Sequence, residues 1–398
     1  MKKKICLLSY DLRSGGAERV ISQWSDLLKD DFEVYMTTFQ DQVMYPYSGR
    51  YVCLNVDDNY STPIHKVLNV IRRARALRKF VKRENIDIVL SFCNECNLAN
   101  VISLHSAKKI CSIRSASDLD ANAFVKYVIK SKQNDIIIQT EALKQQILES
   151  YGSRLSHKLF VYGNPFNVEK IRDMAKCKVP DSLDEILANN RCLINVGSFK
   201  VAKNHANLLK SFELVAKEVD DVILILVGAN NIFLGEQIVQ MAQKSACSDR
   251  IIFAGETKNP FALESRSAMF VFPSLAEGIP NALAEAMIVG LPVISSNCPT
   301  GPAELLSETP FEINYNESGY CESDYGVLVK PFSGPSVPDY NDINEENRRF
   351  ARPIIRALQD EKFYNALVEK SRQGAERFDI EKYREGLVNM INQISYGK

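Results

Sequence analysis

Two glutamates, Glu277 and Glu285, bracket the stretch Glu-Gly-Ile-Pro-Asn-Ala-Leu-Ala-Glu. The apolar run 268–273 before it is typical of a strand that is buried on both faces. From Asn281 onward the apolar residues follow helical spacing, and Asn281 is expected to be the N-cap. The pattern therefore predicts Glu277 in the loop at the carboxyl end of a strand, with Glu285 about one turn into the next helix.

This position suits the binding of a phosphorylated sugar. In open α/β sheets, ligands bind outside the carboxyl ends of the strands. A helix N-terminus there offers backbone N–H groups and a positive dipole end to phosphate. Carboxylates on either side of such an anion site could accept hydrogen bonds from sugar hydroxyls. A single glutamate is more often a solvated charge, so this interpretation depends on the whole stretch.

The elements that must position these residues repeat a strand, loop, helix order in both halves of the chain. Strands are expected at 4–9, 32–38, 51–56, 86–92, 109–113, 135–139 and 159–162, and then at 192–196, 222–227, 251–254, 270–272 and 292–295. Thr140 is expected to cap a helix, and two helices, 348–375 and 380–395, follow the loop-like segment 331–347. The order predicts two doubly wound parallel sheets, and a length of 398 residues also favours two domains.

The first expected strand leads into the loop Tyr10–Gly16 and a helix from Ala17. A strand, a glycine-containing loop and a helix can together hold a phosphate. Only Gly15 and Gly16 are present, however, so the dinucleotide-binding fingerprint is absent. A simple tight turn is the more common reason for such a pair.

The segment 65–83 is predicted to be a long amphipathic helix. Its apolar stripe consists of Val67, Val70, Ile71, Ala74, Leu77 and Val81, and its eight basic residues are Lys66, Arg72, Arg73, Arg75, Arg78, Lys79, Lys82 and Arg83. Such a helix can lie on an anionic membrane surface. It can equally be a crossover helix with a wet basic face, and the two interpretations are compatible.

The overall composition excludes several classes of protein. Lys+Arg and Asp+Glu both number 49, so no global binding of nucleic acid is indicated. No apolar run is long enough for a transmembrane helix. The ten scattered cysteines suit reduced core thiols in a cytoplasmic protein. The pair Cys93 and Cys96 lacks a second pair at zinc spacing, so no metal site is expected.

The stretch 277–285, with Gly-Leu-Pro-Val-Ile from Gly290, resembles the donor-site signature of the family-4 retaining glycosyltransferases (glycosyl transferases group 1). Residues 14–20 resemble the first loop of many of these enzymes, and the resemblance is strongest in 192–306. It implies the GT-B fold: two Rossmann-like domains with a cleft between them. The implied acceptor-binding domain comprises residues 1–164 plus a C-terminal helix at 376–398, and the donor-binding domain comprises 165–375.

The resemblance implies an activity as well. A sugar would pass from a nucleotide diphosphate sugar, most often a UDP-sugar, to a glycan or lipid-linked acceptor, with retention and without a metal or other cofactor. Bacterial enzymes of this kind build surface polysaccharides such as O-antigen or capsule. The protein is therefore expected in the cytoplasm, with possible peripheral contact to the cytoplasmic face of the membrane through residues 65–83.

By the same resemblance, Glu277 and Lys203 are the catalytic residues: Glu277 holds the donor sugar and Lys203 binds its phosphate. Glu285 would accept the ribose hydroxyls. The remaining donor-site residues would be Gly197, Ser198, Lys200, Gly255, Thr257, Gly278, Ile279, Pro280, Asn281, Ala282 and Leu283, and the acceptor side would include Gly15, Gly16 and Arg114.

The chain departs from the family pattern at two positions. Ser198 stands where an arginine is common, and Lys200 is a candidate to replace its charge. Arg114 stands about where many members have a histidine, and Ser115 and Asp118 beside it could face the acceptor or form an ordinary turn. Two alternatives remain open. One is a nucleotide-sugar epimerase or hydrolase of the same fold, and the other is a non-catalytic nucleotide-sugar-binding subunit, which the departures at Ser198 and Arg114 keep open.

Overall fold

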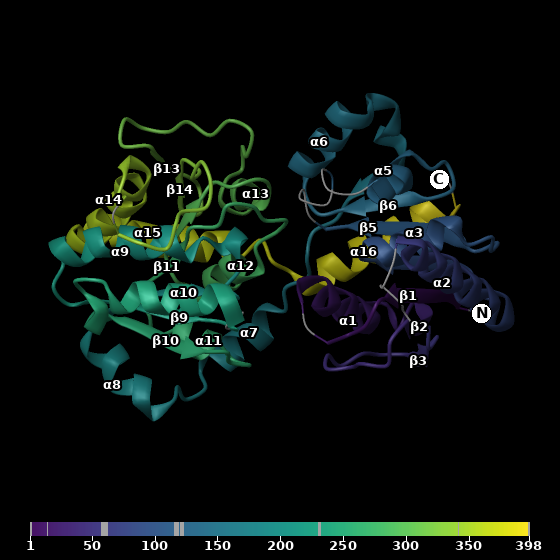
Figure 1. Cartoon of the computed structure of the whole chain (residues 1–398), viewed down its shortest axis with the longest axis horizontal. Helices are drawn as coiled ribbons and strands as arrows, with labels where there is room; N and C mark the ends of the chain where they lie inside the picture. Colours follow the sequence, from purple (N-terminus) through teal and green to yellow (C-terminus); the bar gives the residue numbers. More distant parts are fainter. Residues whose placement is uncertain are drawn as a thin grey trace. The chain divides into compact units, whose positions relative to one another are not determined.

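The computed structural model of the chain describes residues 2–13, 15–56, 63–114, 119, 123–229, 232–340 and 342–396. The chain divides into two compact units (Figure 1). Unit 1 comprises Met1–Pro165 and Ile380–Lys398, and unit 2 comprises Phe166–Asp379. Ser115 and Asp118 lie outside the described residues.

Unit 1 is built on a parallel sheet in which β1 lies inside the strand order β3-β2-β1-β4-β5-β6-β7. Its strands are β1 (Lys3–Ser9), β2 (Phe32–Thr38), β3 (Arg50–Cys53), β4 (Ile88–Phe92), β5 (Lys108–Ile113), β6 (Asp135–Ile138) and β7 (Leu159–Val161). All of these pairings are parallel, as the β-rich apolar runs predict.

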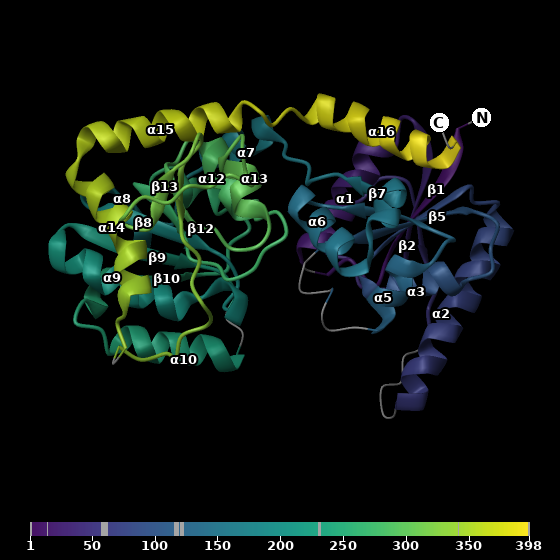
Figure 2. The same ribbon diagram turned by 90° about the horizontal axis from the view of Figure 1, so that it is seen from above.

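Helices cover both faces of this sheet (Figure 2). They are α1 (Gly16–Leu28), α2 (Pro63–Glu84), α3 (Asn94–Ile102), α5 (Ala123–Lys130), α6 (Glu141–Tyr151), the 3-10 helix η1 (Ser153–Lys158) and α16 (Ile380–Tyr396). Alternating residues of β1 show the division of the core. Ile5 packs in a cluster with Trp24 of α1 and Ile391 of α16, whereas Cys6 packs with Phe80 of α2.

Unit 2 repeats this design, with the strand order β10-β9-β8-β11-β12-β14-β13. Its strands are β8 (Arg191–Val196), β9 (Val222–Val227), β10 (Ile251–Gly255), β11 (Met269–Phe272), β12 (Val293–Ser296), β13 (Tyr320–Glu322) and β14 (Val327–Val329). The sheet is parallel except for β13, which pairs with β14 in antiparallel orientation.

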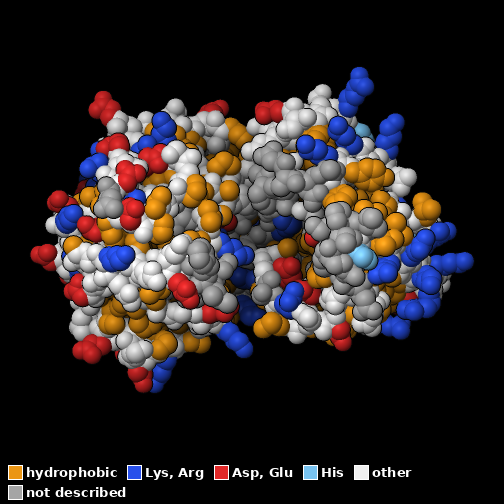
Figure 3. Space-filling view, viewed as in Figure 1, with side chains coloured by type: hydrophobic (Ala, Val, Ile, Leu, Met, Phe, Trp, Pro, Cys, Tyr) orange, Lys and Arg blue, Asp and Glu red, His pale blue; other side chains and the backbone are white. Residues whose placement is uncertain are grey.

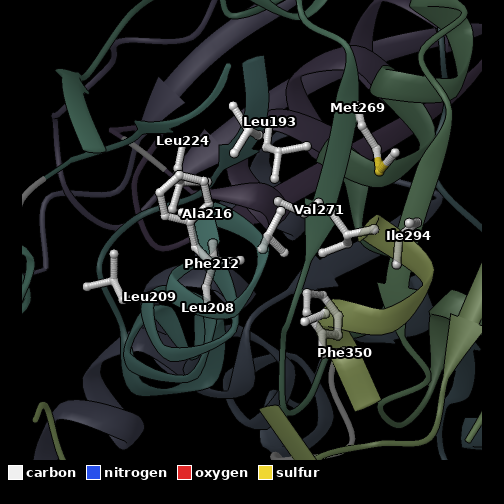
Figure 4. Close-up of a cluster of buried hydrophobic side chains, with 14 of the residues drawn as sticks. Leu193, Leu208, Leu209, Phe212, Ala216, Leu224, Met269, Val271, Ile294 and Phe350 are labelled. Atoms are coloured by element: carbon white, nitrogen blue, oxygen red, sulfur yellow. The ribbon is translucent and has the colours of Figure 1, made fainter. Parts of the chain in front are cut away.

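The helices of unit 2 bury both faces of its sheet. They are α7 (Val168–Ala175), α8 (Asp181–Asn189), η2 (Val201–Lys203), α9 (His205–Glu218), α10 (Ile232–Gln243), η3 (Ser248–Arg250), α11 (Phe261–Glu264), α12 (Asn281–Val289), α13 (Gly301–Leu306), α14 (Glu345–Gln359) and α15 (Glu361–Ala375). One core gathers Leu193, Phe212 and Phe350 from β8, α9 and α14 (Figure 4). The other contains Phe272 and Met287.

Both units therefore confirm the predicted class of two doubly wound, mainly parallel α/β domains. In each unit the first strand lies inside the sheet, and the chain builds outward on one side before it crosses to the other. The crossing falls between β1 and β4 in unit 1, and between β8 and β11 in unit 2. Loops diverge at such a crossing on the carboxyl edge, which makes it the expected ligand site.

Two local predictions about helix ends fare differently. The cap at Thr140 is confirmed, since its side chain accepts a hydrogen bond from the Leu143 N–H at 3.1 Å. The single helix at 348–375 is wrong, because α14 and α15 are separate helices that meet at Asp360. The Asp360 side chain accepts from the Phe363 N–H at 3.0 Å and so starts a new helix where periodicity alone indicated continuity.

The prediction for α2 also needs correction. Arg73 is only 1% exposed, and its guanidinium lies over the rings of Tyr10 and Phe39, so it is not part of a wet basic face. Val67 is 53% exposed, so the expected buried stripe does not extend to that end of the helix. In the remaining turns the stripe residues Ala74, Leu77 and Val81 are buried, as predicted. Phe80 is also buried, although it was not part of the predicted stripe.

The tight packing of α15 generates a stability prediction for Gly374→Ala. A Cβ at this position would lie 2.8 Å from the Tyr325 Cβ and 2.4 Å from the Met287 Cε. Alanine favours a helix over glycine by about 1 kcal/mol, whereas overpacking a core costs about 1–3 kcal/mol. We expect the substitution to lower the free energy of unfolding in urea melts. The exposed neighbour Gln373→Ala should have little effect, and a stabilised Gly374→Ala protein would contradict the described packing.

Candidate functional site

An ion pair joins the loops that follow β8 and β11, the two strands at the crossing of unit 2. Lys203 Nζ lies 2.7 Å from Glu277 Oε1, and both side chains are mostly buried. The stem of Lys203 runs along Gly197, and its ammonium lies 5.1 Å from the centre of the Phe272 ring. The two residues assigned catalytic roles from the sequence are therefore in direct contact.

Backbone contacts between the same two loops fix the position of Lys203. The residue ends η2, and Asn204 after it adopts a left-handed conformation with φ of 57°. Asn204 Nδ2 donates to the Pro273 carbonyl at 3.1 Å, and the Leu275 N–H donates to the Ala202 carbonyl at 2.8 Å. Asparagine tolerates this left-handed conformation better than most residues. The ammonium consequently projects from a short, restrained turn.

Glu277 is held from the other side by the loop after β12. Its N–H donates to the Pro299 carbonyl at 2.7 Å, and its carbonyl accepts from the Thr300 N–H at 2.9 Å. A Cβ on Gly301 would lie 2.0 Å from the Gly278 carbonyl oxygen, so only glycine permits this approach. These backbone contacts fix the position of Glu277, so that its carboxylate is directed at Lys203.

Three glycines close the carboxyl edge beside the ion pair, at the ends of β8, β9 and β10. The Gly197 N–H donates to the Val227 carbonyl at 2.8 Å, and the Gly228 N–H donates to the Gly255 carbonyl at 2.9 Å. A Cβ on Gly228 would lie 2.0 Å from the Gly197 carbonyl oxygen. Gly228 was not among the sequence-predicted site residues, although its place directly after a strand is the signal that marks Gly197 and Gly255.

The titratable side chains next to the ion pair, His205 and Cys298, are uncharged near neutral pH. Burial and the charge of Lys203 lower the pKa of His205 to about 3, so this imidazole is neutral at physiological pH. Burial, and then the nearby Glu277 carboxylate, raise the pKa of the Cys298 thiol. Neither residue is therefore a reactive ion near neutral pH, and the local electrostatics are governed by Lys203 and Glu277.

Glu285 lies in α12 and is only 3% exposed. The helix begins at Asn281 and its N-cap is Pro280, so the prediction that Asn281 is the N-cap is wrong. The Leu283 N–H already donates to the Pro280 carbonyl at 3.1 Å. A phosphate at this end would thus meet fewer uncommitted N–H groups than the sequence indicated, and the side-chain cation gains importance.

The other predicted donor-site residues lie around these loops. Ser198, Gly278, Ile279 and Ala282 are half-buried, and the Lys200 side chain is exposed. Thr257 is also exposed, and its hydroxyl accepts from the Asn259 N–H at 3.2 Å. Lys203, and not Lys200, is therefore the lysine whose ammonium lies next to Glu277.

Unit 1 has a pocket of about 600 Å³ at its own crossing, between the loops after β1 and β4. It is lined by Tyr10, Asp11, Arg13, Glu18, Met44, Cys93 and Glu95. Gly15 precedes α1 with φ of 141°, and a Cβ there would lie 2.2 Å from a Glu18 carboxylate oxygen. Gly15 is therefore required for Glu18 to fold back at the start of α1, where Gly16 is the first residue.

Sequence reasoning missed most of this pocket. Asp11 is 6% exposed and pairs with Arg13 Nε at 2.8 Å, while Glu95 comes from the first turn of α3. The signal was available, because the loops after the first and fourth strands of a doubly wound sheet meet at the crossing. Applying that rule to unit 1 would have placed Asp11 near Glu95.

Arg114 directly follows β5 and is half-buried. Its Nη2 donates to Asn164 Oδ1, and its guanidinium lies 5.6 Å from the centre of the Phe92 ring. Phe92 ends β4, so Arg114 lies at the same edge of the sheet as the loops that line the pocket. The expected first-domain residues therefore occupy one edge of unit 1.

Within the residues that the structure describes, no group of three or more His, Cys, Asp or Glu side chains could hold a metal ion. All ten cysteines are free thiols. The same described part of the chain contains no helix that is long and apolar enough to span a membrane.

Comparison with known proteins decides what kind of domain holds the ion pair. Residues 190–322 match the family described as Glycosyl transferases group 1. Unit 2 carries a glycosyl transferases group 1 domain. The matched residues include Lys203, Glu277 and Glu285, so the ion pair lies within a glycosyltransferase domain.

Two relatives extend the similarity along most of the chain. An uncharacterised glycosyltransferase of Methanocaldococcus jannaschii is 27% identical over 353 residues, covering 82% of this chain and 84% of the relative. The N-acetylgalactosamine-N,N'-diacetylbacillosaminyl-diphospho-undecaprenol 4-alpha-N-acetylgalactosaminyltransferase of Campylobacter jejuni is 22% identical over 393 residues. That alignment covers 95% of this chain and 96% of the relative.

The fold also matches solved structures. HepE of Anabaena, solved in complex with UDP, aligns with a TM-score of 0.72 over 99% of this chain and 100% of HepE, at 14% sequence identity. The likeness establishes the GT-B fold of two Rossmann-like domains, as expected from the sequence.

The neutral, buried His205 generates a pH prediction. Its pKa of about 3 in the folded protein is below its ordinary value of 6.5, so the unfolded chain takes up the proton first as the pH falls. Stability from this residue is present above pH 6.5 and is lost from there toward pH 3. We expect the wild type to lose up to about 1.4 kcal/mol per pH unit more than His205→Gln in this range.

Urea melts of both proteins at several pH values between about 7 and 5 provide the measurement. The comparison between the two proteins is needed because burial also lowers the pKa of His105, to about 4, and this contribution is common to both. Equal slopes of stability against pH in the two proteins would show that His205 is not held neutral by its site.

Proposed function

We propose that the protein is a retaining, metal-independent glycosyltransferase that moves a sugar from a UDP-sugar to a lipid-linked glycan during assembly of a surface polysaccharide. The observation that carries this proposal is the Lys203–Glu277 ion pair, with 2.7 Å between its charged atoms, at the crossing of unit 2. It supplies a cation for a diphosphate and a carboxylate for sugar hydroxyls within one short contact.

In the proposed reaction, the bond between the anomeric carbon of the sugar and the β-phosphate oxygen breaks. Negative charge builds on the departing diphosphate, and Lys203 stabilises it as a positioned cation. Glu277 accepts hydrogen bonds from the sugar and lies near the positive charge that develops on the ring. The acceptor hydroxyl bonds to the anomeric carbon on the same face, and its proton passes to the departing diphosphate.

The remaining donor contacts are assigned from their positions in unit 2. Glu285 is assigned to the ribose hydroxyls because it lies in the first turns of α12, the helix that follows the Glu277 loop at the carboxyl edge of the sheet. Gly197, Gly228 and Gly255 let the backbone approach the nucleotide closely, and Thr257 lies at its edge. UDP is supported as the carrier by HepE, which was solved with this nucleotide.

We assign the acceptor to unit 1. Its pocket combines three carboxylates, Asp11, Glu18 and Glu95, with the ring of Tyr10, a combination that suits sugar hydroxyls and the apolar face of a sugar. The Campylobacter relative supports a lipid-linked acceptor, since its name specifies a diphospho-undecaprenol substrate.

A surface of unit 1 suits contact with the membrane that carries such an acceptor. Exposed apolar side chains lie on and after α2, α3 and α5: Val67, Leu68, Leu104, Phe124 and Tyr127. Exposed basic side chains of α2 include Arg72, Arg75, Arg78 and Lys79. Figure 3 shows hydrophobic and basic side chains side by side over these helices. Apolar area with a cationic surround favours binding to an anionic lipid surface.

The first test of this function is sugar transfer by Lys203→Ala and Glu277→Gln. We expect Lys203→Ala to lower kcat about 100-fold or more, because one preorganised donor at a developing anion contributes about that much. Glu277→Gln should raise KM for the donor sugar. Transfer from radiolabelled UDP-sugars to lipid extract, with EDTA present, measures both effects, and NMR of the product gives the anomeric configuration.

Each alternative has its own outcome in this assay. Release of free sugar would indicate a hydrolase, and formation of an epimerised sugar would indicate an epimerase. Tight donor binding without turnover would indicate a non-catalytic binding subunit. Loss of transfer with EDTA would contradict metal independence, and full activity of Lys203→Ala would contradict the assigned site.

The second test concerns the membrane surface. Replacing Arg72, Arg75 and Lys79 with glutamine should weaken binding to anionic vesicles about 100-fold, since each basic residue near the surface contributes about 1 kcal/mol. Co-sedimentation with phosphatidylglycerol vesicles measures the change.

A matched control replaces three exposed lysines of unit 2, Lys178, Lys244 and Lys362, with glutamine. It removes the same total charge from another part of the chain. Equal loss of vesicle binding in the two triple variants would show that net charge, and not the α2 surface, determines membrane contact.

A further inference from the structure

Arg114 is a half-buried cation of unit 1 that has no anionic partner among the described residues. Its Nη2 donates to Asn164 Oδ1 and, in the amide orientation that satisfies both side chains, to Gln139 Oε1 at 2.8 Å. Both acceptors are neutral amides. Its Nη1 is buried without a hydrogen-bond partner in the described structure.

Burial dominates the electrostatics of this guanidinium. It lowers the pKa of Arg114 to about 10, and among the described residues the phenol of Tyr383 opposes this effect. Burial also raises the pKa of Tyr383 well above its ordinary range, so the phenol is neutral at physiological pH. Arg114 therefore remains charged, and its buried Nη1 has neither a hydrogen-bond acceptor nor a counter-ion among the described residues.

A purely structural role does not account for a charge without a counter-ion at this place. Tying the end of β5 to Asn164 and Gln139 requires hydrogen-bond donors but no charge, and a neutral amide would supply them. Asp11 in the neighbouring pocket is paired with Arg13, so it does not compensate Arg114. A ligand that brings an oxyanion to this edge would supply both the missing charge and a partner for Nη1.

We propose that Arg114 binds an oxyanion of the substrate, through the two-pronged contact that a guanidinium makes with a phosphate or a carboxylate. The oxyanion belongs either to the diphosphate that links an acceptor sugar to its lipid or to a carboxylate on a sugar. This inference rests on the proposed function. It assigns to Arg114 the binding of a negatively charged group, which the carboxylates of the neighbouring pocket would repel.

The chain provides its own reporter for this site. Trp24 is its only tryptophan, and its ring packs 5.3 Å from the Phe92 ring, over which the Arg114 guanidinium lies. Trp24 Nε1 also donates to the Tyr383 hydroxyl at 2.8 Å. An anion that binds Arg114 should therefore change the fluorescence of Trp24.

The first experiment titrates Lys203→Ala protein with inorganic pyrophosphate and follows Trp24 emission. The Lys203→Ala background removes the phosphate-binding cation of unit 2, so the signal reports on unit 1. We expect a saturable change that Arg114→Met abolishes. Asn164→Ala removes a hydrogen bond from the same guanidinium but keeps its charge, and it should preserve the response. No response in the Lys203→Ala protein, or an unchanged response in Arg114→Met, would overturn the proposal.

A second variant tests the charge without removing the arginine. Gln139→Glu places a carboxylate where the amide oxygen contacts Nη2, and so supplies an internal counter-ion. We expect a higher Tm together with at least a 10-fold weaker pyrophosphate response, because the ligand must now compete with this carboxylate. A higher Tm with unchanged pyrophosphate binding would mean that Arg114 has only a structural role.

Steady-state kinetics separate the two sources of the oxyanion. If it is the acceptor diphosphate, Arg114→Met should raise KM about 10-fold or more for a diphosphate-linked acceptor and leave KM for a neutral glycoside of the same sugar unchanged. If the oxyanion is a sugar carboxylate, Arg114→Met should instead raise KM for substrates with a uronic acid and leave KM for the corresponding neutral sugars unchanged.

These outcomes also separate failure of this inference from failure of the proposed function. Sugar transfer with an unchanged KM for every substrate in Arg114→Met would overturn the anion site and keep the glycosyltransferase. A Trp24 response that requires Arg114, in a protein that transfers no sugar, would keep the anion site and overturn the proposed reaction.

Discussion

The strand order and the loop contacts of unit 2 together position one ion pair, in which Lys203 and Glu277 lie 2.7 Å apart. The strand order brings β8 beside β11, and the loops after these strands supply one residue each. Asn204 and the Leu275–Ala202 backbone contact restrain the lysine side, while Pro299 and Thr300 restrain the glutamate side. The charge-assisted contact keeps the two side chains directed at each other. In the proposed reaction, the pair exchanges its internal contact for a diphosphate and a sugar.

Unit 1 has the same topology but a different balance of charge at its edge. The pocket at its crossing is rich in carboxylates, which suits hydroxyl groups, whereas Arg114 at the end of β5 lacks a counter-ion in the described structure. One fold thus presents a compensated cation in unit 2 and an uncompensated one in unit 1. This difference is consistent with a donor whose phosphates are held in unit 2 and with an acceptor that brings its own negative charge to unit 1.

Strand and helix periodicity predicted nearly all strands of both sheets, because parallel strands buried on two faces form unmistakable apolar runs. The short β13 and β14 were missed, since three residues each give no periodic signal. The break between α14 and α15 was missed because Asp360 caps a helix without interrupting its apolar pattern. At the site, the family resemblance indicated Lys203 and Glu277, but their contact depends on backbone restraints from Asn204 and Gly301. The burial of Arg73 and the orphan nitrogen of Arg114 arise from tertiary packing, which no local pattern encodes.

The most direct test of the central claim is calorimetric titration of Glu277→Ala with UDP and with a UDP-sugar. If Glu277 compensates Lys203 and also holds the sugar, its removal frees the ammonium for phosphate but deletes the sugar contact. UDP should then bind as tightly as in the wild type or more tightly, whereas the UDP-sugar should bind more weakly than in the wild type. Equal losses of affinity for both ligands, or no change in either, would contradict the account of the ion pair as the two halves of a donor site.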